Sequence, residues 1–138
     1  MIRFTAKTVE AFSTEFCKDF VVFNIFFEEC DREEGGQSWS FQRALGADGT
    51  IESREEEDEG VCTVKEIQQL TLYEGIERVK LSRNKFVCKF NIEAIQQIKI
   101  EGLEIDYSID DDRWKRLIRI AVLVFRNRDY FRIARSLG

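Results

Sequence analysis

Acidic side chains are the most concentrated chemical groups in this sequence. Between Glu52 and Glu59, only Ser53 and Arg54 are not acidic. Like charges at this density repel one another and keep a segment hydrated. Carboxylates can also enter a basic cleft of another protein. The opposite charges then speed association, and the inserted segment keeps that protein's own substrate out of the cleft. The run therefore predicts either a solvated loop or a partner-binding surface, whose candidate residues are Glu52, Glu55, Glu56, Glu57, Asp58 and Glu59.

Two larger side chains upstream are further candidates for partner binding. Trp39 lies on an expected strand, and Gln42 and Arg43 are close to the end of that strand. Trp and Arg are frequent anchors of protein interfaces, and the planar guanidinium group suits pairing with carboxylates. A core position for Trp39 and a structural ion pair for Arg43 are the alternatives.

The residue types that several kinds of catalysis require are missing. The chain contains no His, which removes the Ser-His-Asp triad, the Cys-His dyad and the commonest metal ligand. Its four cysteines form no CxxC element and are expected to be reduced structural thiols rather than disulfides or metal ligands. We therefore expect no catalytic residue, metal or cofactor, and a protein that is not an enzyme. Two close carboxylates in a deep pocket would revive the enzyme hypothesis.

Charge is unevenly distributed along the chain. Residues 1–112 contain 13 Lys or Arg against 25 Asp or Glu, whereas residues 113–138 contain 8 against 1. A basic tail with Tyr130 and Phe131 would suggest nucleic-acid binding in a basic protein, but the acidic remainder would repel phosphate. We expect no nucleic-acid partner. The tail is expected to pack against the protein's own acidic surface or against a second subunit.

The elements that must position these groups follow from hydrophobic periodicity. The 138 residues, 43% of them hydrophobic, are enough for one domain with a core. Alternating or continuous apolar residues predict strands, and helical spacing with Asn or Asp caps predicts two helices. The expected strands are 2–12, 20–27, 38–45, 61–73 with a bend near Glu66, 76–83, 85–92 and 103–109, and the expected helices are 92–98 and 111–126.

The fold class predicted from these elements is α+β. Residues 1–138 form a single domain with a mostly antiparallel sheet, one dominant C-terminal helix packed on it and a short second helix, while residues 126–138 form a basic extension. The segment 20–27 is expected to be buried on both faces because it is almost continuously apolar. The apolar face of the main helix is wider than one contact needs, so a second layer covers it or it forms a homodimer interface.

No segment approaches the roughly 20 apolar residues of a membrane span, and the N-terminus has no signal-peptide pattern. A cytoplasmic protein with no membrane partner is therefore expected.

The order of several short motifs resembles a known family. Phe41-Gln42-Arg43 ends a strand before the acidic run, and Tyr73-Glu74-Gly75-Ile76 leads into Val79-Lys80-Leu81-Ser82-Arg83. An alternating strand, Ile105 to Ile109, and a helix that opens with aspartates follow. From about Ile2 to Phe125, the chain resembles the immunity protein 10 family of bacterial polymorphic toxin systems.

The resemblance implies a cytoplasmic bacterial protein that inhibits a cognate toxin by tight non-covalent binding, without turnover. The family supplies no catalytic residue. Within the motif, Tyr73 and Gly75 are expected to serve the turn, with glycine providing backbone freedom. The alternative function is a self-associating structural or adaptor protein.

Overall fold

The computed structural model describes residues 1–17, 20–30, 36–46, 60–65 and 70–134. The bend expected near Glu66 lies outside the described residues. So do all the acidic candidate residues, which are Glu52, Glu55, Glu56, Glu57, Asp58 and Glu59.

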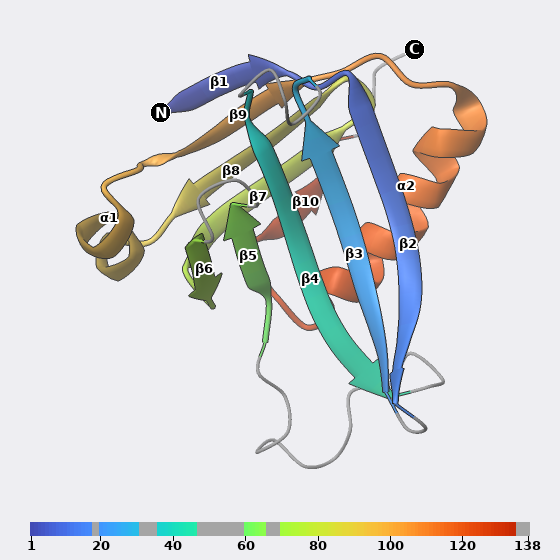
Figure 1. The fold of residues 1–138 in the computed structure, drawn as a ribbon, viewed down its shortest axis with the longest axis horizontal. Helices are drawn as coiled ribbons and strands as arrows, with labels where there is room; N and C mark the ends of the chain where they lie inside the picture. Colours follow the sequence, from blue (N-terminus) through green and yellow to red (C-terminus); the bar gives the residue numbers. More distant parts are fainter. Residues whose placement is uncertain (18–19, 31–35, 47–59, 66–69, 135–138) are drawn as a thin grey trace.

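The described strands form two five-stranded sheets whose strands run in different directions (Figure 1). Sheet A has, in spatial order, β1 (Ile2–Thr5), β9 (Gly102–Asp106), β8 (Lys85–Phe90), β7 (Ile76–Ser82) and β10 (Phe131–Ile133). Sheet B has β2 (Thr8–Cys17), β3 (Phe20–Glu28), β4 (Ser38–Gly46), β5 (Cys62–Lys65) and β6 (Leu70–Tyr73). Neighbouring strands are antiparallel, except that β1 pairs with β9 and β10 pairs with β7 in parallel.

The α+β class is confirmed, but the strands divide between two sheets instead of one. The strand expected over 2–12 is two strands, because the backbone N–H of Ala6 donates to Asp106 of sheet A and that of Lys7 to Glu28 of sheet B. The segment expected as one bent strand over 61–73 is also two strands, β5 and β6, which pair antiparallel with each other.

Both helices begin where their caps predict. Helix α1 spans Ile92–Ile98, and the Asn91 side chain accepts a hydrogen bond from the Ala94 amide at 2.9 Å. Helix α2 spans Asp111–Val124, and the Asp110 side chain accepts from the Arg113 amide at 2.8 Å. Each cap satisfies a backbone donor that the first helical turn leaves unpaired.

The core lies where the two sheets face each other. Phe86 of sheet A is fully buried, and its ring centroid lies 4.8 Å from that of Phe27 and 4.9 Å from that of Phe41, both in sheet B. Tyr107, just after β9, stacks on Phe27 at 5.8 Å. These aromatic contacts join strands that are distant in the sequence.

Strand β3 is not buried on both faces as predicted. Phe23, Ile25 and Phe27 are buried, whereas the residues between them are only partly buried. One face of β3 meets the core and the other is partly open, because nothing among the described elements covers that side as a full layer.

Helix α2 packs on β2, β3 and β4, beside sheet A (Figure 1). It buries Leu117, Ile120, Ala121 and Val124. Ile120, part of the wide apolar face, is therefore covered within the molecule, while Val122 remains 46% exposed. Self-association through α2 stays a prediction.

Ion pairs on sheet A lead to a testable pH dependence. Glu104 accepts from Lys85 at 2.8 Å and from Arg3 at 3.0 Å. The hydrogen bond from Lys85, followed by that from Arg3, lowers the pKa of Glu104 below its ordinary value. A lowered pKa stabilises the fold above the unfolded-state pKa of about 4.3, and this contribution is lost as the pH falls through the folded-state pKa.

We therefore expect the stability difference between the wild type and Glu104→Gln to be present at pH 7 and to shrink as the pH falls below about 4. Urea unfolding across this range measures it. Glu101→Gln, at an exposed position without an ion pair to a described residue, is the control. A difference that stays constant with pH would contradict the expectation.

Candidate functional site

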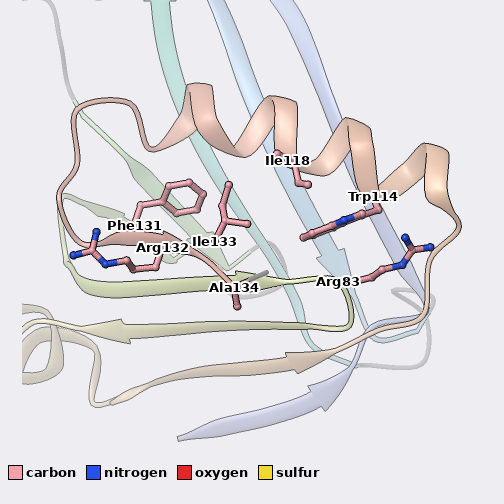
Figure 2. A pocket seen from close by; sticks show the side chains of 7 residues that line it. All are labelled: Arg83, Trp114, Ile118, Phe131, Arg132, Ile133 and Ala134. Atoms are coloured by element: carbon pink, nitrogen blue, oxygen red, sulfur yellow. The ribbon is translucent and has the colours of Figure 1, made fainter. Parts of the chain in front are cut away.

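An open groove lies between α2 and β10 (Figure 2). Its volume is about 600 Å³. The lining side chains are aromatic, aliphatic and cationic: Arg83, Trp114, Ile118, Phe131, Arg132, Ile133 and Ala134. Trp114 and Ile118 extend from the helix toward Phe131 and Ile133 on the strand. The groove thus has two apolar walls that come from different elements.

Helical and strand periodicity place these side chains. Trp114 and Ile118 are four residues apart, so they lie on the same face of α2. Phe131 and Ile133 are two residues apart in β10 and project to the same side. Because β10 pairs with β7 and the Ala134 amide donates to the Leu81 carbonyl at 2.8 Å, the groove wall formed by β10 is fixed to sheet A.

Arg83 lies at one end of the groove, in the turn between β7 and β8. It forms an ion pair with Asp111, in the first turn of α2. A second cavity of about 700 Å³ shares Arg83 and Ala134 with the groove and is also lined by Tyr107. The Tyr107 hydroxyl donates to the Ser82 carbonyl at 2.5 Å, and burial raises its pKa. This phenol is therefore held protonated.

The groove presents chemistry suited to non-covalent binding. Trp114 and Phe131 are partly buried and keep part of each ring open to solvent. Aromatic and guanidinium groups are the side chains that contribute most to protein interfaces. Among the described residues, no three Cys, Asp or Glu side chains come together as a metal site would require.

The prediction that Trp39 contacts a partner is wrong, because the side chain is 0% exposed. Its ring lies 6.1 Å from that of Phe90, and the Lys65 ammonium lies 5.7 Å from the ring centroid. The indole N–H donates to Gln37 at 3.0 Å. Trp39 is a core residue, which was the alternative to partner binding that the sequence left open.

Arg43 is also unavailable to a partner, since it is 1% exposed. Its guanidinium donates to the carbonyls of Val124 at 3.3 Å and Arg126 at 2.8 Å. Carbonyls at the end of a helix have no intrahelical donor, and a cation there also interacts favourably with the helix dipole. Arg43 therefore ties β4 to the C-terminal end of α2.

The basic extension contributes to the fold, because residues 131–133 form a strand of sheet A. Arg128 pairs with Glu74, with its Nε 2.8 Å from the carboxylate. This part of the tail packs on the protein's own acidic side chain, one of the two arrangements predicted. The groove residues Trp114 and Phe131 were not among the residues predicted to bind a partner.

Gly75 serves the turn in a different way from the one predicted. The positive φ angle of this turn belongs to Glu74, at 53°. A Cβ on Gly75 would lie 2.3 Å from Cδ2 of Leu72 and 3.0 Å from Cβ of Ala94. Gly75 is needed because Leu72 of β6 and Ala94 of α1 leave no room for a side chain there, which is a requirement of space rather than of backbone freedom.

The fold and the groove together define a two-sheet α+β domain with an open amphipathic surface site. Comparisons with protein-family models, with curated proteins and with solved structures give no match. No described helix has both the length and the apolar character needed to cross a bilayer. The groove is therefore the feature of the described structure from which a function can be proposed.

Proposed function

We propose that this protein is a bacterial immunity protein that binds and neutralises a cognate polymorphic toxin in the cytoplasm. The observation that carries the proposal is the open groove whose lining runs from Arg83 and Trp114 at one end, past Ile118 and Ile133, to Phe131 and Arg132 at the other. The resemblance of the motifs from Phe41 to Ile109 to the immunity protein 10 family supports a toxin as the partner.

The groove suits tight binding because its walls are already in place. Phe131 stacks on Phe125 with centroids 4.9 Å apart, so this ring is held by the core. A preformed site avoids the entropic cost of ordering its side chains when the partner arrives. An apolar side chain of the toxin would pack in the groove against Trp114, Ile118 and Ile133, and the bulk of the immunity protein would exclude the toxin's substrate.

The acidic run provides a second contribution within the same function. Its charge would attract a basic cleft of a toxin that acts on nucleic acid, and would raise the association rate. In this proposal the groove governs how long the complex lasts, and the acidic run governs how fast it forms.

Co-expression with the product of the adjacent upstream gene tests the proposal. We expect the upstream product alone to stop growth of a sensitive bacterium, and this protein to restore growth and to co-purify with that product. Toxicity without rescue, or an upstream product that is harmless, would refute the immunity function.

Removing the indole should weaken the complex more than any change of charge nearby. We expect Trp114→Ala to raise the Kd for the toxin by about 30-fold, the equivalent of about 2 kcal/mol for an interface anchor. Isothermal titration calorimetry measures the change in Kd. Surface plasmon resonance separates the two rate constants, and we expect most of the change in the dissociation rate.

Val122→Ala is the matched control, because Val122 is exposed on the same helix and does not line the groove. It should change the Kd by less than about threefold. Replacing Glu55, Glu56 and Glu57 with Lys should instead slow association and leave dissociation nearly unchanged. Equal effects of Trp114→Ala and Val122→Ala would place the interface elsewhere.

A further inference from the structure

Four cations lie next to one another on sheet A. They are Arg78 and Lys80 of β7, Lys89 of β8 and Arg132 of β10, and all four are exposed. In the strand register Arg78 is opposite Lys89, and Lys80 is opposite Arg132. We call these residues the cation quartet.

The quartet is on the outer face of the sheet. Val79, Leu81 and Cys88 alternate with its members along β7 and β8, and each is fully buried toward the core. Successive side chains of a strand project to opposite faces. The quartet therefore faces away from sheet B, and only Arg132 also reaches the end of the groove.

This arrangement has a cost for the fold that ion pairs do not offset. Like charges that are directly opposite on paired strands repel each other. No member of the quartet forms an ion pair with a described residue, and Glu104, on the neighbouring strand, is already bound by Arg3 and Lys85. Paired strands are about 4.8 Å apart, so the four charges lie within about two Debye lengths of one another at physiological salt.

We propose that the cation quartet binds an extended acidic segment of a protein partner. Carboxylates on alternate residues of an extended chain repeat at about 6.6 Å, the same spacing that separates Arg78 from Lys80 along β7. Such a segment can neutralise all four charges from one side of the sheet. The proposal rests on the proposed function only in taking the toxin as the natural partner.

An acidic protein segment fits this face better than a nucleic acid does. The exposed or partly exposed positions beside the quartet on β7, β8 and β9 are Glu77, Ser82, Lys85, Val87, Glu104 and Asp106, none of which is aromatic. Binding of single strands depends on aromatic side chains on which the bases stack. A long polyanion would also extend beyond the quartet over a protein whose net charge is −5.

A labelled peptide tests the proposal with the purified full-length protein. The probe is a fluorescein-labelled eight-residue peptide of alternating Glu and Thr, followed by fluorescence anisotropy at low salt. We expect it to bind, with an affinity that falls as salt is added. The double variant Lys80→Gln/Lys89→Gln should weaken binding at least tenfold.

The matched control is Lys115→Gln/Arg119→Gln, which also removes two positive charges, but from exposed positions on α2. It should change the affinity by less than about twofold. Equal weakening by the two double variants, no binding of the peptide, or tighter binding of a single-stranded dT12 probe would overturn the proposal.

The two proposals fail in different ways. If the toxin is neutralised by the wild type and the peptide does not bind, the quartet is not the acidic-segment site and the immunity function stands. If the peptide binds through the quartet and no toxin is neutralised, the surface assignment stands and the immunity function fails.

Discussion

Replacing Arg43 with alanine is expected to lower the free energy of unfolding by about 3–5 kcal/mol. The side chain is 1% exposed and donates to the carbonyls of Val124 and Arg126. Alanine would leave these buried or partly buried acceptors without the donor and would open a cavity between β4 and the end of α2. Small domains are stable by only about 5–15 kcal/mol, so the variant would lose a large share of its stability.

Urea unfolding followed by far-UV circular dichroism measures this loss. Arg43→Lys keeps a positive charge but cannot reproduce the forked geometry of guanidinium, so we expect a smaller loss of about 1–2 kcal/mol. Arg119→Ala, at an exposed position on α2, should change stability by less than about 0.5 kcal/mol. If Arg43→Ala is as stable as Arg119→Ala, the contact between β4 and α2 contributes nothing to the fold.

Replacing Phe86 with alanine is expected to cost about 3–5 kcal/mol of stability. Phe86 is 0% exposed, and its ring contacts Phe27 and Phe41 of the opposite sheet. Its removal takes away the side chain through which β8 meets two strands of sheet B. The cost is large because the surrounding rings belong to paired strands and cannot collapse fully into the cavity.

Thermal and urea unfolding of Phe86→Ala, Phe86→Leu and Val87→Ala distinguish this explanation from a general effect on β8. Leu restores most of the volume and should limit the loss to about 1.5 kcal/mol. Val87 is on the opposite face of the same strand and is only partly buried, so its truncation should cost about 1 kcal/mol or less. Equal losses for Phe86→Ala and Val87→Ala would mean that strand propensity, and not the contact between sheets, decides the stability.

Local patterns were sufficient to predict most of the elements. The hairpin of β7 and β8 follows from two alternating runs around Ser82-Arg83-Asn84, and the starts of α1 and α2 follow from Asn91 and Asp110. Alternation and capping depend on interactions between residues that are close in the sequence. Such interactions can be read without knowing the rest of the fold.

The candidate site was much less predictable. Trp39 and Arg43 have the residue types of interface anchors, yet both are buried. The acceptors of Arg43 are 81 and 83 residues further along the chain. The wall of the groove that carries Phe131 comes from a strand of three residues, which is too short to produce a periodic pattern.

By itself, the sequence determined the α+β class, both helix starts and the main hairpin, because each depends on residue order and short-range geometry. Only the tertiary structure decided that the strands divide between two sheets, that β10 completes sheet A beside α2, and that Lys80 and Arg132 become neighbours. The physical reason is that strand pairing joins distant residues, and the burial of the whole core selects which strands pair.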